Sequence, residues 1–345
     1  LAAVRAEMSI SQAVEDLAVD VDNPDSVTQM VDACQVVITT VGPYQLYGDE
    51  LVKQCAERGT DYVDLTGEPS WMHETIAQYS SAAKASGARI VHSCGFDSIP
   101  FDLGVYRLQQ HAIAKTGQPI AMVKGRVRAM NGTFSGGTIA SMRATMASAK
   151  ANPAIIQVLT NPFALTEGFT GPEQPAGMAP QYDEELKSWS APFIMAPINT
   201  KNIHRSNFLL GHQYGEDFRY DEMLLTGDGD QGKAAADYVA KDDSVAKSDL
   251  QPGEGPTKEE RENGNYDAIF AGETQDGELM ISSVQGDRDP GYGSTSKMLA
   301  EAAMCLLVNP DLASGGLWTP AAAMGDALMA RLQEHAGLTF QVEKG

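Results

Sequence analysis

The chain has 345 residues, of which 43% are hydrophobic and 21% charged, a composition typical of a globular protein large enough for two domains. Its 46 acidic and 25 basic residues give a formal net charge of −21, which repels nucleic-acid phosphates and anionic membranes, so neither is an expected electrostatic partner. No apolar run approaches the roughly 18 residues of a transmembrane segment, although peripheral membrane association stays open.

The spacing of cysteine and histidine gives no sign of metal or disulfide chemistry. The cysteines at positions 34, 55, 94 and 305 show no C-x-x-C pairing, and the histidines show no H-x-x-x-H spacing. We therefore expect reduced thiols, a cytoplasmic location and no metal site.

Predicted strands and helices alternate in the first third of the chain. Apolar, β-branched runs predict strands, and two helical stretches end at Gly59 and Gly87. A further helix opens at Pro100, where Asp97 or Ser98 is expected to cap the free N–H groups. The preceding elements are strand 34–41, helix 49–58, strand 62–66, helix 71–86 and strand 89–93. This alternation predicts a doubly wound parallel α/β sheet.

The carboxyl ends of these strands form the predicted binding site, because a doubly wound sheet binds its ligand there. Connection handedness places the three turns on one edge of the sheet, so we expect their residues along one crevice. Ordinary βα turns without a ligand are the alternative. The residues of this predicted site are Thr39, Thr40, Val41, Gly42, Pro43, Tyr44, Thr66, Gly67, Glu68, Cys94, Gly95 and Phe96.

A second domain is predicted from about residue 118. Strand 120–130 carries Lys124, Arg126 and Arg128 at alternate positions, and therefore on one face. The stretch Gly136-Gly137-Thr138 leads into a helix over 139–150. Its free N–H groups could bind a carboxylate, a phosphate or a thioester oxygen, or could form a plain capping turn.

The rest of this domain is predicted to be a mostly antiparallel sheet with covering helices. We expect an irregular covering loop over 152–190 and an exposed loop over 244–264. A hairpin through Asp276-Gly277 joins strands 266–274 and 278–285. The other expected elements are strand 193–199, a loop with part of a strand or short helix over 202–210, strand 220–225, helix 232–240 and helix 294–308.

Several motifs resemble those of one known family. They are TTVGPY (39–44), YVDLTGE (62–68) and HSCGFDSIP followed by DLG (92–104), with further agreement over 134–142, 191–200, 252–264, 289–306 and 315–328. On these motifs the chain resembles the saccharopine-dehydrogenase-like oxidoreductases. Within them it is most similar to the actinobacterial branch that includes the trans-acting enoyl reductases of lipid biosynthesis.

The resemblance implies a Rossmann-like domain over 1–117, an inserted α+β substrate domain over 118–288, and a C-terminal segment over 289–345 that packs back on the first domain. It implies NADP, or NAD, as cofactor and an unsaturated acyl (enoyl) thioester or related lipid precursor as substrate. Family members begin with a strand and a Gly-rich phosphate turn, whereas Leu1 to Glu7 look like a later helix. We expect the first strands upstream of this sequence; the alternative is a protein that lacks them.

For such a reduction the candidate proton donors are Tyr44, Asp97 and Ser98, with Glu68 and Tyr292 less favoured. A structural role is the alternative for each.

Apolar loops favour an acyl or lipid-like substrate, in a pocket formed by parts of 133–142, 163–169 and 193–199. A saccharopine-type imine reductase would instead use Arg126, Arg128 and Arg143 to bind a small polycarboxylate. A non-catalytic, lipid-associated scaffold protein of the same fold is the third alternative. A homodimer is compatible with the sequence.

Overall fold

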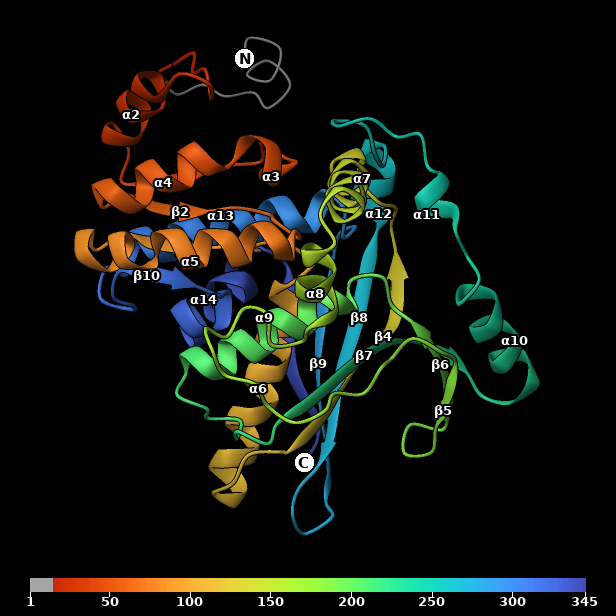
Figure 1. Cartoon of the computed structure of the whole chain (residues 1–345). Helices are drawn as coiled ribbons and strands as arrows, with labels where there is room; N and C mark the ends of the chain where they lie inside the picture. Colours follow the sequence, from red (N-terminus) through yellow and green to blue (C-terminus); the bar gives the residue numbers. More distant parts are fainter. Residues whose placement is uncertain (1–14) are drawn as a thin grey trace.

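The computed structural model describes residues 15–345, so the helix predicted at Leu1 to Glu7 lies outside the described residues. The first sheet is parallel, with the strand order β1-β2-β3-β10 (Figure 1). Its strands are β1 (Val36–Ile38), β2 (Asp61–Val63), β3 (Arg89–Val91) and β10 (Gly316–Trp318). The three predicted strands are therefore present, each shorter than the apolar run that predicted it.

Helices cover this sheet and end where the sequence predicts. Helix α4 (Asp49–Arg58) and helix α5 (Pro69–Ser86) pack against each other, and each ends at a glycine with positive φ, Gly59 at 82° and Gly87 at 90°. A left-handed residue closes a helix at low cost only when it lacks a Cβ. Helix α13 (Gly293–Val308) packs against β1 and β2 and against α14 (Pro320–His335). The remaining helices on this side are α2 (Pro24–Asp32) and the short α3 (Tyr44–Tyr47).

The second sheet is mixed and mostly antiparallel, with the strand order β11-β9-β8-β4-β7-β6-β5. Only the β4–β7 pair is parallel among its pairs. The strands are β4 (Met122–Asn131), β5 (Gln181–Asp183), β6 (Ser188–Pro192), β7 (Arg219–Gly227), β8 (Asn265–Glu273), β9 (Leu279–Gly286) and β11 (Leu338–Lys344). The hairpin predicted through Asp276-Gly277 is the β8–β9 pair.

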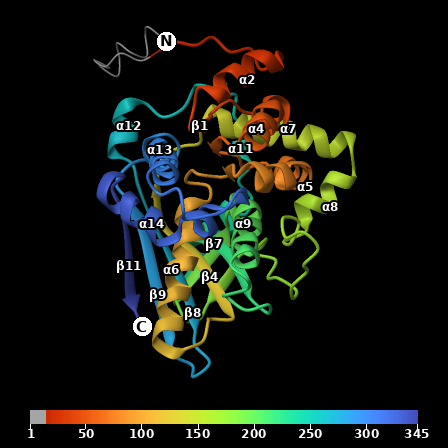
Figure 2. The same cartoon turned by 90° about the vertical axis from the view of Figure 1, so that its left-hand side faces the viewer.

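One hydrophobic core joins the two sheets, and helix α6 (Ile99–Thr116), which contributes to it, lies against β8 and β9 of the second sheet (Figure 2). The ring of Phe101 contacts Phe96 in the turn after β3, Phe193 after β6 and Phe270 on β8. The last part of the chain serves both sheets, because β10 pairs with β3 and β11 pairs with β9. Between residues 15 and 345 no helix is both long and apolar enough to cross a membrane.

Four predictions of local structure are wrong. The stretch 202–210, expected to be a loop with part of a strand or short helix, lies almost entirely within one long helix. Residues 193–199 do not form a strand, because Pro197 opens helix α9 (Ala196–Leu209) directly after a short turn. The loop predicted over 152–190 contains helix α8 (Ala154–Thr160) as well as β5 and the start of β6. The loop over 244–264 contains α11 (Ser244–Lys247) and α12 (Lys258–Asn263), the second closed by a capping box between Thr257 and Glu260.

The two remaining helices match their predictions more closely. Helix α7 (Gly136–Ala151) contains the predicted helix 139–150 and begins three residues earlier, where Ser135 caps the N–H of Thr138. Helix α10 (Gly229–Val239) likewise contains most of the predicted stretch 232–240.

Candidate functional site

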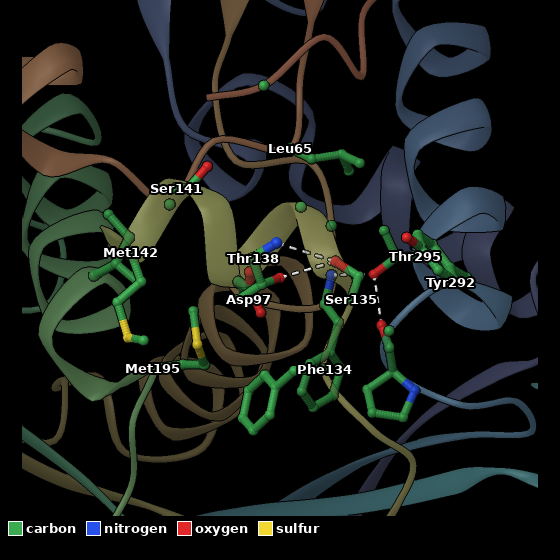
Figure 3. Close-up of a pocket in the computed structure, with 18 of the residues that line it drawn as sticks. Leu65, Asp97, Phe134, Ser135, Thr138, Ser141, Met142, Met195, Tyr292 and Thr295 are labelled. Atoms are coloured by element: carbon green, nitrogen blue, oxygen red, sulfur yellow. Dashed lines mark hydrogen bonds between the residues drawn. The ribbon is translucent and has the colours of Figure 1, made fainter. Parts of the chain in front are cut away.

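A cavity of about 770 Å³ lies between the two sheets, at the carboxyl ends of β1, β2 and β3 (Figure 3). Residues from all three strand-end turns line it, together with the start of α7, the turn before α9 and the start of α13. The structure therefore brings these three turns together at one cavity. Of the predicted site residues, those in the lining are Thr40, Gly42, Tyr44, Gly67, Gly95, Phe96 and Asp97.

The other predicted site residues surround the cavity without belonging to its described lining. Thr39, Thr66, Cys94 and Ser98 are buried, and Glu68 is fully buried. Val41 is exposed, and Pro43 is the residue that precedes α3. These side chains shape the turns rather than the cavity surface.

The wall opposite the strand ends is apolar, and methionine dominates it. Met142 and Met195 lie near each other in this wall, one on α7 and the other in the turn before α9 (Figure 3). Methionine is flexible and unbranched, so such a wall adapts to ligands of irregular shape. The other large apolar side chains in the lining include Met130, Phe134, Met146, Leu159, Phe193, Ile194 and Ile198.

No lysine or arginine belongs to the described lining of this cavity. Arg126 is buried against Asp221, Arg128 pairs with Asp267 on β8 and Glu343 on β11, and Arg143 donates to the carbonyl of Ser248. The three arginines considered for a polycarboxylate therefore lie elsewhere. The segment 163–169, expected in the pocket, also lies outside the described lining, and its Phe163 packs on His204.

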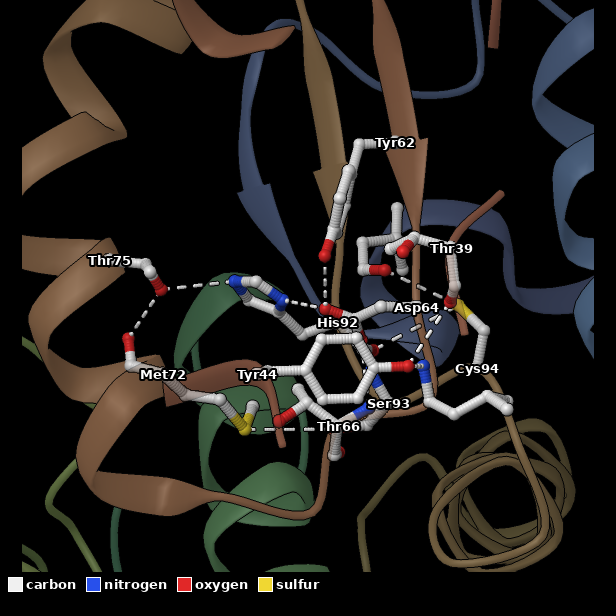
Figure 4. Close-up of polar contacts among 12 residues, drawn as sticks. Thr39, Tyr44, Tyr62, Asp64, Thr66, Met72, Thr75, His92, Ser93 and Cys94 are labelled. Atoms are coloured by element: carbon white, nitrogen blue, oxygen red, sulfur yellow. Dashed lines mark hydrogen bonds and ion pairs between the residues drawn. The ribbon is translucent and has the colours of Figure 1, made fainter. Parts of the chain in front are cut away.

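Asp64, in the YVDLTGE motif, holds two strand-end turns together (Figure 4). Its Oδ1 accepts hydrogen bonds from the backbone N–H of Thr66 at 3.0 Å and of Ser93 at 2.8 Å. Its Oδ2 lies 2.7 Å from Nδ1 of His92 and accepts a hydrogen bond from the hydroxyl of Tyr62 at 2.9 Å. This fully buried carboxylate is a brace beneath the cavity.

Tyr44 has a hydroxyl group that is already committed to the backbone. It donates to the carbonyl of Thr39 and accepts from the N–H of Leu65, both at 3.1 Å. Burial and the nearby carboxylate of Asp64 raise the pKa of Tyr44 far above its ordinary value. The ring stacks on Trp71. This arrangement ties the first turn to the second and leaves the hydroxyl poorly placed to give up a proton.

Ser98 and Asp102, in the third motif, hold helices in place. Ser98 precedes α6 but its side chain does not cap that helix; its hydroxyl donates to Asn199 at 3.3 Å and accepts from Asn202 at 2.7 Å. The expected cap is therefore absent. Asp102 accepts a hydrogen bond from the N–H of Ala321 at 2.8 Å, at the start of α14, and burial raises its pKa to about 7.

Asp97 differs from these residues because it faces the cavity (Figure 3). Its carboxylate makes no hydrogen bond or ion pair with any residue in the described part of the chain. Burial raises the pKa of Asp97 to about 6. It is the one carboxyl group in the described lining. The remaining titratable side chains in that lining are those of Tyr44 and Tyr292. The hydroxyl of Tyr292 donates to the carbonyl of Glu254 at 2.9 Å.

The motifs FSGGT and PGEGP meet at the start of α7. A Cβ on Gly136 would lie 1.7 Å from the carbonyl oxygen of Gln251, so only glycine fits. The N–H of Gly136 donates to the carbonyl of Glu254 at 2.8 Å. Pro252 and Gly253 thereby reach the cavity and line it. No sequence signal linked these distant segments.

The strand-end turns fit the nicotinamide end of a dinucleotide. Gly67 leaves open space toward the cavity, since a Cβ there would have no neighbour closer than Asp97 Oδ2 at 3.9 Å. Such openness lets a flat ring approach the backbone. No cluster of His, Cys, Asp and Glu that could hold a metal ion occurs in residues 15–345.

Comparison with known proteins agrees with this geometry. Residues 2–91 match the saccharopine dehydrogenase NADP binding domain. A Mycobacterium tuberculosis protein named as a candidate trans-acting enoyl reductase is 39% identical over 95% of this chain and 84% of its own length. A trans-acting enoyl reductase of Mycobacterium ulcerans is 34% identical over 91% of this chain and 82% of its own length.

A solved structure shares the fold at low sequence identity. It is the apo form of a histidine-tagged, L-Glu-forming saccharopine dehydrogenase from Saccharomyces cerevisiae, which matches with a TM-score of 0.50 and 12% identity over 98% of this chain and 91% of that chain. From the sequence relatives, the chain belongs to the saccharopine-dehydrogenase-like family of NADP-binding oxidoreductases, and it is related to the trans-acting enoyl reductases.

Proposed function

We propose that the protein is an NADPH-dependent reductase of an α,β-unsaturated acyl thioester. The observation that carries this proposal is the position of Asp97, an unpartnered carboxyl group in an apolar cavity at the strand ends. The names of the relatives support the reaction class, and the matched NADP-binding domain supports the cofactor. NAD is the alternative cofactor, and a cytoplasmic location is part of the proposal.

The proposed chemistry needs one hydride and one proton. When bound, a reduced nicotinamide would supply the hydride to the β-carbon of the substrate, and the α-carbon would then take a proton. Asp97 is the acid that we assign to this second step, because its raised pKa keeps part of the population protonated near neutral pH. The protein residues Thr40, Gly42, Gly67, Gly95 and Phe96 would hold the nicotinamide end of the cofactor.

The apolar wall has the complementary role of binding the acyl chain. Met142, Met195 and Phe193 offer an adaptable apolar surface that a small polycarboxylate would not use. The absence of a cationic side chain in the described lining argues in the same direction. A saccharopine-type imine reductase is therefore disfavoured.

Binding and turnover can be tested separately on the full-length protein. Titration with NADPH and NADH, followed by cofactor fluorescence, should show saturable binding and a preference for NADPH. Addition of a long-chain 2-enoyl thioester should then lead to oxidation of the bound cofactor. A mixture of a keto acid and an amino acid, which together form a polycarboxylic imine, should leave the cofactor reduced. If neither nucleotide binds at millimolar concentration, the non-catalytic scaffold function takes the place of this proposal.

A further inference from the structure

Glu68 is a fully buried carboxylate beside the cavity, yet it does not belong to the cavity lining. Its Oε1 accepts hydrogen bonds from the N–H of Tyr44 and from the hydroxyl of Ser141, both at 2.8 Å. Its Oε2 accepts from the N–H of Gln45 at 2.9 Å and from the side-chain amide of Gln45 at 2.8 Å.

These four hydrogen bonds use the full accepting capacity of the group, because a carboxylate offers about four lone-pair sites. Two donors reach each oxygen, so no site remains for a cofactor hydroxyl or for a substrate. Glu68 therefore does not act as a ligand or as a proton donor. Its partners show what it does instead.

The donors come from two parts of the protein that are distant in sequence. Tyr44 and Gln45 begin α3, next to the first strand-end turn, whereas Ser141 lies on α7. Gln45 extends the same connection, since its Nε2 donates to Thr145 at 3.1 Å and its Oε1 accepts from Ser148 at 2.7 Å. Ser141, Thr145 and Ser148 follow helical spacing, so one polar stripe of α7 faces Glu68 and Gln45.

The neighbouring face of α7 contributes to the apolar wall through Met142 and Met146, each of which directly follows a residue of the polar stripe. The helix has little packing of its own, because only Gly136 and Ile139 are buried along its length. Figure 1 shows α7 between the α3–α4 layer and the second sheet. Its position over the cavity thus depends strongly on the polar stripe.

We propose that Glu68 and Gln45 form a latch that holds α7 across the cavity and so positions the acyl-binding wall over the cofactor turns. Glu68 is a positioning residue in this arrangement. The kinetic part of the test rests on the proposed reductase function, whereas the exchange part does not.

Hydrogen–deuterium exchange of α7 amides in the free protein tests the latch directly. Ser148→Ala removes one hydrogen bond to Gln45 without touching the cavity lining, and Glu68→Gln removes acceptors at the centre. In both variants we expect the amides over 139–151 to exchange up to about tenfold faster than in the wild type, while the amides of α5 keep their wild-type exchange rates. Glu74→Gln, an exposed glutamate on α5, is the matched control and should leave α7 unchanged.

Steady-state kinetics gives the second readout. In Ser148→Ala the KM for the enoyl thioester should rise several-fold while the Kd for NADPH stays unchanged, because only the acyl wall has loosened. If the α7 amides of Ser148→Ala exchange at the wild-type rate, the latch is overturned. This conclusion does not depend on whether Glu68→Gln folds or on whether the protein reduces a thioester. Faster exchange in a protein that reduces no thioester supports the latch and contradicts the proposed reaction instead.

Discussion

The carboxylate of Asp97 lies beside Gly67, with Oδ2 only 3.9 Å from the position that a Cβ on this glycine would take. Gly67 follows β2 and Asp97 follows β3, so the two residues belong to neighbouring strand-end turns. In the proposed function the nicotinamide ring would occupy the open space above Gly67, which Asp97 borders. This relationship brings the proposed acid close to the place where the hydride would be delivered.

Asp97→Asn should abolish most turnover and leave cofactor binding intact. The amide keeps the size of the side chain but cannot give a proton to the α-carbon, so we expect kcat to fall by about 10² or more. NADPH fluorescence titration should give the wild-type Kd. The exposed hairpin variant Asp276→Asn is the control, and near-normal kcat in Asp97→Asn would remove this residue from the mechanism.

The rate should also depend on pH through Asp97. Because burial raises its pKa to about 6, the protonated form becomes scarce as the pH rises above that value. We expect kcat to decline by about tenfold per pH unit in the alkaline limb, provided that proton transfer limits the rate. The residual activity of Asp97→Asn should lack this limb. A limb that persists in the variant would belong to another group.

The same residue should lower the stability of the protein at neutral pH. The stability that protonated Asp97 contributes is fully present below its ordinary pKa of 3.8 and is lost as the pH rises through about 6. Asp97→Asn should therefore raise the free energy of unfolding at pH 7.5 by on the order of 1–2 kcal/mol, with little effect near pH 4. Thermal denaturation at both pH values measures this difference. Equal effects at the two pH values would contradict a raised pKa for Asp97.

The fold was predictable from sequence where local signals are strong. Helix α4 ends where Gly59 predicts, and the Asp276-Gly277 turn identifies the β8–β9 hairpin. The prediction failed at 193–199, because an apolar run fits a strand and a buried helix equally well. There Pro197 decides the outcome by opening α9. Strand β11 was not predicted at all, and its partner β9 lies more than fifty residues upstream.

The location of the site could be predicted from the sequence, but the roles of its individual acidic residues could not. The strand-end rule identified the three turns, whereas the functions of their acidic residues depend on partners far away in sequence. Asp102 meets the backbone of Ala321 and Glu68 meets Ser141, and neither contact leaves a local signal. Asp64 likewise binds the N–H of Ser93. A motif gives the residue type, and only the fold shows which N–H or hydroxyl group each carboxylate meets.

Tyr44→Phe should reduce stability more than catalysis. Loss of the hydroxyl leaves the N–H of Leu65 and the carbonyl of Thr39 without their partner in a buried turn, which costs about 1–3 kcal/mol. Denaturant unfolding should show this loss, while kcat of the folded variant should stay within about threefold of wild type, since the hydroxyl is already bonded to two backbone groups. A large fall in kcat with unchanged stability would restore Tyr44 as the proton donor.

Two glycines of the same cavity should respond differently to substitution. Gly67 does not have a positive φ, and a Cβ on it would have no neighbour closer than 3.9 Å, so Gly67→Ala should fold and bind NADPH normally. Gly67→Leu should fold as well, but its side chain should fill the space proposed for the nicotinamide ring. We therefore expect the Kd for NADPH to rise by about 10-fold or more, a factor that corresponds to about 1.4 kcal/mol.

A Cβ on Gly95 would instead lie 2.9 Å from the side chain of Leu65 and 3.2 Å from that of Thr295, whose hydroxyl accepts a hydrogen bond from the N–H of Phe96. Gly95→Val should therefore lose about 1–3 kcal/mol of stability through overpacking. NADPH titration and thermal denaturation of all three variants separate the two effects, and normal NADPH affinity in Gly67→Leu would place the nicotinamide elsewhere.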